Sequence, residues 1–132
     1  MTSSRQHGRP VILLVEEEAS ERQAIARHLE ESGFAVVEAE DSDKALAFLE
    51  GRSGVRGIVR GIVTDAHVPG RVEGFELAGL VRRRWPAVAV VMMSGHSDAV
   101  SGPVPDGGAF VAKPYILSHL VPALNRLLDR AG

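Results

Sequence analysis

Acidic, hydroxyl and amine side chains follow several short apolar runs of this 132-residue sequence. They are Glu16, Glu17 and Glu18, then Asp65, Ser94 and Lys113. Carboxylates that gather closely repel one another unless a cation joins them or one of them takes a proton. Mg²⁺ suits such a group, because it prefers oxygen ligands and usually combines few carboxylates with phosphate oxygens and water. The residue types therefore indicate a Mg²⁺ site beside a reactive carboxylate.

Within such a group an aspartate can attack phosphorus as a nucleophile and form an aspartyl phosphate. The amine of Lys113 and the metal would neutralise the transferred oxygens, and the hydroxyl of Ser94 would hydrogen-bond one of them. Asp65 is thus the candidate phosphoryl acceptor. A purely structural hydroxyl at the end of a strand remains the alternative for Ser94. A solvated or helix-capping acid is the alternative for Glu18.

The apolar runs read as strands, because they alternate with amphipathic stretches in the pattern of an α/β fold with a parallel sheet. We predict strands at 11–15, 34–39, 58–64 (ending at Asp65), 88–93 and 110–112. In an open parallel sheet, ligands bind outside the carboxyl ends of the strands. The acids, the serine and the lysine would therefore converge on one edge of a doubly wound, five-stranded sheet.

Helix signals separate these strands. A capping box of Ser20 and Gln23 predicts the start of the first helix, and Gly33 predicts its end. Ser42 is predicted to cap a second helix that ends at Gly51. A third helix is expected at 74–84, before Trp85-Pro86.

The last third of the chain is less regular. A closing helix is expected at about 118–130, with Pro122 in its first turn or so, where at most one backbone bond is lost. The segment 97–108 contains two prolines and three glycines, so a fourth helix there would be short or absent.

Composition limits the class of protein. A chain of this length with 45% hydrophobic and 24% charged residues fits one compact domain. The absence of cysteine excludes thiol chemistry and cysteine metal sites. The net charge of −2 gives no sign of a nucleic-acid partner, and no apolar run is long enough to cross a membrane or form a signal peptide. We expect a cytoplasmic domain at 11–130 after a flexible tail at 1–10.

Six motifs in order resemble the receiver domain of bacterial two-component response regulators. They are Leu-Leu-Val-Glu-Glu-Glu at 13–18, Val-Val-Glu-Ala at 36–39, Thr-Asp-Ala-His-Val-Pro-Gly at 64–70, Glu-Gly-Phe-Glu-Leu-Ala at 73–78, Met-Ser-Gly-His at 93–96 and Phe-Val-Ala-Lys-Pro-Tyr at 110–115. The resemblance covers about 11–128 and is closest to short, stand-alone receivers with a shrunken fourth helix. It implies the flavodoxin-like receiver fold.

The resemblance also implies a role for individual residues. Asp65 matches the phosphoacceptor, Glu16 and Glu17 match the paired acids that organise Mg²⁺, and the backbone carbonyl of His67 matches the third protein ligand. Ser94 matches the hydroxyl that follows the phosphoryl group, and Lys113 matches the lysine that pairs with it, in a Lys113–Pro114 bond that is cis in the family. Phe110 matches the aromatic switch residue, which acts together with Ser94; simple core packing is its alternative.

Glu17 departs from the family pattern, which usually has an aspartate at this position. Its extra methylene moves the carboxylate by about 1.5 Å, one bond length. Mg²⁺ demands near-ideal geometry, so we expect reduced but real affinity. His67 and His96 occupy positions that flank the phosphorylated aspartate in the family. They are predicted either to tune the lifetime of the phosphoryl group or to be partly exposed loop residues.

The leading interpretation is a phosphorylation-controlled signalling module, not an enzyme, which catalyses only its own phosphorylation and dephosphorylation. Its expected partners are a sensor histidine kinase or phosphotransfer protein and an unidentified downstream protein, because we expect no output segment after residue 128. Two alternatives stay open. One is a pseudo-receiver that binds partners without phosphorylation, which Glu17 would favour. The other is a small phosphohydrolase with an aspartate nucleophile.

Overall fold

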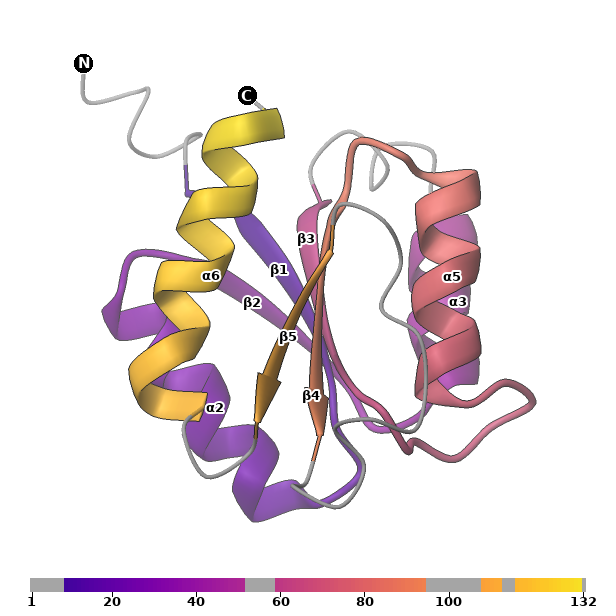
Figure 1. Cartoon of the computed structure of the whole chain (residues 1–132). Coiled ribbons are helices and arrows are strands. Elements are labelled where there is room, and N and C mark those ends of the chain that lie inside the picture. Colours follow the sequence, from indigo (N-terminus) through magenta and orange to yellow (C-terminus); the bar gives the residue numbers. More distant parts are fainter. Residues whose placement is uncertain (1–8, 52–58, 95–107, 113–115, 132) are drawn as a thin grey trace.

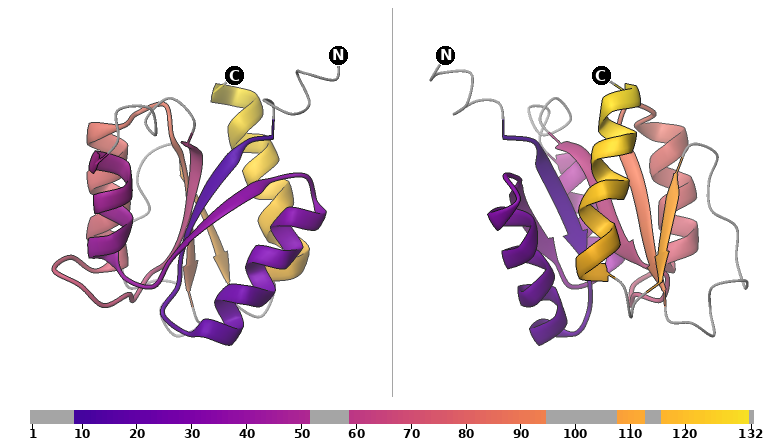
Figure 2. Two further views of the ribbon diagram at one scale, coloured as in Figure 1. Left: turned by 180° about the vertical axis from the view of Figure 1, so that it is seen from behind. Right: turned by 60° about the vertical axis from the view of Figure 1, so that its left-hand side comes forward.

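The computed structural model describes residues 9–51, 59–94, 108–112 and 116–131. Its five strands form one parallel sheet in the order β2-β1-β3-β4-β5. Helices α2 and α6 cover one face of the sheet, and α3 and α5 cover the other (Figures 1 and 2). The predicted doubly wound five-stranded α/β fold is confirmed.

Every predicted strand is present, with boundaries that differ by at most one residue from those expected. The strands are β1 (Val11–Val15), β2 (Ala35–Ala39), β3 (Val59–Asp65), β4 (Ala89–Ser94) and β5 (Ala109–Ala112). The central strands are almost wholly buried because helices lie on both faces. This explains why β1 is a continuous apolar run and why β4 is apolar up to its last residue, Ser94.

The four helices of the described residues are α2 (Ala19–Glu31), α3 (Ser42–Gly51), α5 (Gly74–Arg84) and α6 (Ile116–Ala131). The predicted end of α3 at Gly51 and both predicted boundaries of α5 are confirmed. Gly33, at φ 101°, follows α2 in the left-handed conformation that the predicted glycine stop requires. Most of the segment 97–108, where a short or absent helix is predicted, lies outside the described residues.

The starts of α2 and α3 differ from the prediction. Glu18, rather than the expected box of Ser20 and Gln23, caps α2, because its carboxylate accepts the Glu21 N–H at 2.8 Å. The Ser20 hydroxyl donates to the same carboxylate at 2.7 Å. A capping acid was the alternative left open for Glu18.

Asp41, rather than Ser42, caps α3. Its Oδ1 accepts the Lys44 N–H at 2.7 Å. Ser42 is the first residue of the helix and is fully buried, and its hydroxyl donates to the carbonyl of Pro69 at 3.3 Å. The side chain that was expected to cap the helix thus reaches the loop after β3 instead.

Pro122 lies deeper in α6 than expected. The helix begins at Ile116, two residues before the predicted start, so Pro122 falls in its second turn. The proline has no N–H, so one intrahelical bond is missing there. Pro122 is exposed, so this defect lies on the solvent side. The opposite side of α6 packs on the sheet through Leu120, Leu124 and their neighbours.

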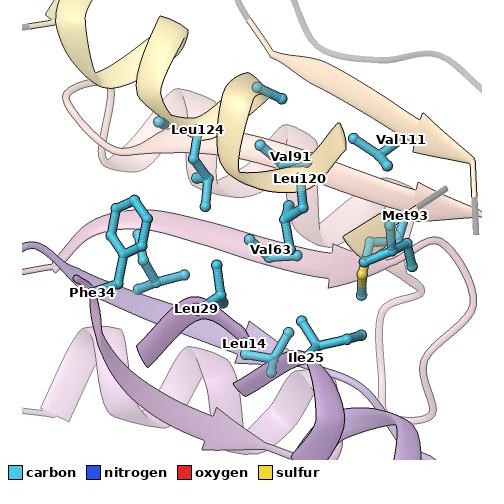
Figure 3. Close-up of a cluster of buried hydrophobic side chains, with 14 of the residues drawn as sticks. Leu14, Ile25, Leu29, Phe34, Val63, Val91, Met93, Val111, Leu120 and Leu124 are labelled. Atoms are coloured by element: carbon cyan, nitrogen blue, oxygen red, sulfur yellow. The ribbon is translucent and has the colours of Figure 1, made fainter. Parts of the chain in front are cut away.

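Two apolar clusters hold the layers together, one on each face of the sheet. Figure 3 shows the cluster between the sheet, α2 and α6, in which side chains of the helices such as Ile25 and Leu124 lie among side chains of the strands such as Leu14 and Val63. The second cluster joins α3 and α5 to the opposite face. Neighbouring strand residues alternate between the two clusters, as the two-residue period of a strand requires.

Candidate functional site

The register of the sheet brings the predicted strand-end residues to one edge. Val15 pairs with Thr64, so the residues that follow them, Glu16 and Asp65, come at the same level on neighbouring strands. Asp65 in turn pairs with Met93, the residue before Ser94. In Figure 1 the strands point to this same edge. The predicted convergence is therefore found for β1, β3 and β4.

Asp65 is the last residue of β3 and is only 8% exposed. Its Oδ1 accepts the backbone N–H of His67 at 3.0 Å. The next residue, Ala66, donates its N–H to the carbonyl of Met93 at 2.8 Å. These bonds fix both the carboxylate and the main chain that leaves the strand.

Glu16 lies directly after β1 and is 2% exposed. Its Oε2 accepts the backbone N–H of Glu18 at 3.0 Å, and its own N–H donates to the carbonyl of Ala39 at 3.0 Å. Glu17, in contrast, is exposed. The two predicted metal-binding glutamates are therefore in different surroundings, one buried at the edge of the sheet and one at the surface.

Ser94 ends β4 and is completely buried. It pairs with Ala112, the last residue of β5. Lys113 itself, the Lys113–Pro114 bond and His96 lie outside the described residues. The backbone of Phe110 belongs to β5 and pairs with Met92. Its side chain is not described.

His67 is exposed, with 52% of its side chain accessible. Its Nδ1 lies 3.7 Å from a carboxylate oxygen of Glu73, and its ring meets the ring of Phe75 edge-on at 6.0 Å between centroids. Glu73 forms a capping box with Glu76 at the start of α5. The imidazole is thus held at the start of α5, while its backbone N–H bonds Asp65.

The loop between Asp65 and α5 is anchored on α3. The N–H of Ser42 donates to the carbonyl of Pro69 at 2.9 Å, and the guanidinium of Arg71 donates to Asp43 at 3.1 Å. Gly70, at φ 125°, lies so close to Ser42 that a Cβ atom would overlap its hydroxyl. This anchoring was not predicted, although the Pro-Gly pair does signal a turn.

The residues present fit a Mg²⁺ ion held by few protein groups. Two buried carboxylates, Glu16 and Asp65, follow neighbouring strands, and buried negative charge favours a bound cation. Both are oxygen donors, as Mg²⁺ requires. Within the described ranges, however, no three side chains among His, Cys, Asp and Glu lie close enough together to hold a metal. A role for Glu17 as ligand stays a prediction.

Sequence reasoning did not identify Arg22 as part of this region. Its guanidinium Nη1 donates to the carbonyls of Glu16 and Glu17 at 2.9 and 3.4 Å. An arginine in the first turn of a helix was the one available signal, because a cation there opposes the helix dipole.

The family model of the response regulator receiver domain matches residues 12–125, so the chain belongs to this family. The nitrogen assimilation regulatory protein NtrX of Azorhizobium caulinodans is 33% identical over 122 residues, covering 89% of this chain and 26% of that protein. A response regulator receiver protein from Sinorhizobium medicae superposes with a TM-score of 0.81 at 27% identity, over 94% of this chain and 98% of that one. The predicted family membership is confirmed.

A further solved structure is that of the response regulator TrrA from Thermotoga maritima in complex with Mg²⁺ and BeF. It has a TM-score of 0.75 at 21% identity, over 89% of this chain and 98% of that one, and shows the shared fold. This chain spans only 24–26% of the length of the first curated relatives that it matches.

Receiver domains are phosphorylation-controlled signalling domains of two-component systems, and this chain is one of them. As a class they bind Mg²⁺ and interact with histidine kinases or phosphotransfer proteins. In the part of the chain that the structure describes, no helix is both long and apolar enough to cross a membrane.

Proposed function

We propose that this receiver domain accepts a phosphoryl group on Asp65. The observation that carries the proposal is the buried Asp65 carboxylate at the end of β3, level with the buried acid Glu16 and one residue from the level of the buried Ser94 hydroxyl. A carboxylate, a second acid and a hydroxyl in this arrangement provide a nucleophile, a cation ligand and a hydrogen-bond donor. Lys113 would complete the set from the end of β5.

In the proposed reaction an oxygen of Asp65 forms a bond to phosphorus. The bond from phosphorus to the donor, a phosphohistidine nitrogen or the leaving oxygen of acetyl phosphate, breaks, and the leaving group keeps the electron pair. The His67 N–H holds one carboxylate oxygen and so fixes the orientation of the nucleophile. Ser94 and Lys113 would bind the transferred oxygens. Mg²⁺, if bound, would be held by Glu16, Glu17, Asp65 and the His67 carbonyl, and it would supply positive charge to the phosphoryl oxygens.

The phosphorylated domain would act in the cytoplasm by changing its binding to another protein. A sensor histidine kinase or phosphotransfer protein is the proposed donor. The only chemistry assigned to the domain is its own phosphorylation and dephosphorylation. Ser94 and Phe110 are the proposed switch pair, because the hydroxyl of Ser94 would follow the phosphoryl group.

A pseudo-receiver is the second candidate, and the exposed position of Glu17 favours it. With this acid outside the buried edge, Mg²⁺ binding would rest on two carboxylates and a carbonyl. A site that binds the ion too weakly would leave a domain that binds its partner without phosphorylation.

Intact-protein mass spectrometry after incubation with acetyl phosphate separates the two candidates. We expect a labile, Mg²⁺-dependent phosphoryl adduct on the wild type and none on Asp65→Asn. Asp129→Asn, which neutralises an exposed acid of α6, is the matched control and should still form the adduct. No adduct at saturating Mg²⁺ would overturn the proposal in favour of the pseudo-receiver, and continued phosphate release from small phosphoesters would favour a phosphohydrolase.

A further inference from the structure

Arg22 lies at a position in α2 where an arginine does not stabilise the helix. It is the fourth residue of α2, where a cation faces the positive end of the helix dipole. Its side chain is nevertheless only 14% exposed, so it does not extend into water as an arginine on a helix surface usually does. A largely covered guanidinium at the positive end of a helix needs polar partners that offset its loss of contact with water.

Those partners are the main chain of the acidic segment and an acid of the neighbouring strand. Nη1 donates to the carbonyl of Glu16 at 2.9 Å and lies 3.4 Å from that of Glu17. Nε forms an ion pair with Glu38 of β2 at 2.9 Å. The fork geometry of a guanidinium allows it to hold two such groups at once, which the ammonium of a lysine does less well.

The contacts of Arg22 complete the support of the buried acid Glu16. The Glu18 N–H donates to the Glu16 carboxylate, and the Glu16 N–H donates to the carbonyl of Ala39. The guanidinium of Arg22 donates to the carbonyl of Glu16. The backbone N–H, the backbone carbonyl and the carboxylate Oε2 of Glu16 therefore each have a described partner. Since Arg22 also reaches the Glu17 carbonyl, it sets the main-chain path that places both acids.

We propose that Arg22 is a positioning residue for the acidic pair, which holds the backbone at Glu16 and Glu17 and thereby sets the Mg²⁺ affinity of the site. The link to Mg²⁺ rests on the proposed function, whereas the positioning of the backbone does not. Residues that orient metal ligands typically change metal affinity by 10–100-fold when they are lost.

The test compares Arg22→Met and Arg22→Lys with Arg27→Met. The control removes the same charge from an exposed arginine of the same helix. Mg²⁺ titrations are followed by amide NMR shifts, because Trp85 follows the far end of α5, roughly 16 Å along the helix from Gly74, and would report poorly on the site. The second readout, which needs no metal, is hydrogen exchange of the Glu18 amide.

We expect Arg22→Met to raise the Mg²⁺ dissociation constant by about 10-fold and to speed exchange of the Glu18 amide. Arg22→Lys should fall between it and the wild type, and Arg27→Met should match the wild type. The rate of phosphorylation at saturating Mg²⁺ should change much less than the rate at low Mg²⁺. Equal dissociation constants for Arg22→Met and Arg27→Met, or equal Glu18 exchange, would overturn the inference.

If Arg22→Met does not fold, Glu38→Gln provides a second variant for the same measurements. It leaves the guanidinium in place and removes the charge of its partner on β2, so a smaller shift in the same direction is expected, and no shift would count against the inference. If the wild type binds no Mg²⁺, the proposed function fails, while the amide exchange still decides whether Arg22 positions the acids.

Discussion

At the scale of single residues, Glu16 and Asp65 share one local arrangement. Each carboxylate accepts the backbone N–H of the residue two positions further along, Glu18 and His67 respectively, at 3.0 Å in both cases. Such short-range bonds orient a buried acid without using a distant partner. Two acids in this arrangement at adjacent strand ends are oriented but still repel each other, and this is the condition in which a cation binds with the greatest benefit.

Glu17→Asp should strengthen Mg²⁺ binding. The shorter side chain restores the usual family pattern and removes a displacement of about 1.5 Å in the carboxylate. We expect the Mg²⁺ dissociation constant, measured by NMR titration, to fall several-fold, on the scale expected for groups that tune a metal site. Glu30→Asp, which shortens an exposed acid near the other end of α2, is the control. An unchanged constant for Glu17→Asp would show that Glu17 is not a ligand.

Asp65, Ser94 and Glu16 could be predicted as site residues because each directly follows a run of apolar residues, and the ends of parallel strands share an edge. Arg22 could not be predicted in the same way. Its role depends on a long side chain that folds back over residues five and six positions earlier and reaches a second strand. No local pattern of hydrophobicity records such a contact.

At the scale of elements, the start of α5 is packed against the end of β3. A Cβ atom on Gly74 would overlap the carbonyl oxygen of Asp65 and the backbone of Ala66. Gly79, in the interior of the same helix, has only the end of Arg83 nearby, at 3.6 Å. The structure therefore leaves no room for a side chain at Gly74 but does leave room for one at Gly79, although both glycines belong to one helix.

Gly74→Ala should destabilise the domain by about 2 kcal/mol or more, because backbone atoms cannot move aside as a flexible side chain can. Gly79→Ala should stabilise it by up to about 1 kcal/mol, since alanine is the better helix former. Denaturant unfolding of both variants measures these differences. Phosphorylation of Gly74→Ala should also slow, as the carbonyl it displaces belongs to Asp65. Equal stabilities for the two variants would contradict the described contact.

The N-cap of α2 makes part of the stability depend on pH. Hydrogen bonds from the Ser20 hydroxyl and from the Glu21 N–H lower the pKa of Glu18 below its ordinary value of 4.5. A lowered pKa in the folded state means that this contribution is present above the unfolded-state value and is lost as the pH falls through the folded-state value.

Glu18→Ala should therefore be less stable than the wild type at neutral pH, and the difference should shrink as the pH falls below 4.5. Urea unfolding across this pH range measures it. Glu30→Ala, a change near the opposite end of the same helix, removes no cap and serves as the control. A difference that stays constant into acid would show that the cap does not depend on the charge of Glu18.

The helix starts show where sequence signals compete. Around α2 the segment Glu-Glu-Glu-Ala-Ser offers several capping residues in succession, and around α3 Asp41 and Ser42 are adjacent. Cap preferences rank aspartate and serine almost equally, so they did not distinguish Asp41 from Ser42, and glutamate is not among the preferred caps, so they did not indicate Glu18. In α3 the tertiary structure decided the choice, because Ser42 is buried against the loop that contains Pro69.

At the scale of the whole molecule, the alternation of apolar runs and amphipathic stretches was sufficient to predict the layers. Both faces of the sheet carry an extensive apolar cluster, so neither could be left without its pair of helices. The start of α6 was predicted at about 118, two residues later than the observed start at Ile116. A proline is tolerated further inside this helix because it lies on the exposed side, away from the packed residues.

The register of the sheet also has a consequence for folding. Glu16, Asp65 and Ser94 meet only when β1, β3 and β4 are paired, and β3 lies more than forty residues after β1 in the sequence. Such long-range parallel pairing forms slowly compared with local helices. A chain that is still emerging from the ribosome, with β4 not yet added, would have Asp65 but no assembled edge around it. The capacity to accept a phosphoryl group is therefore expected to arise late in folding. The rate at which a refolding sample regains the phosphoryl adduct should then report the rate at which β1, β3 and β4 pair.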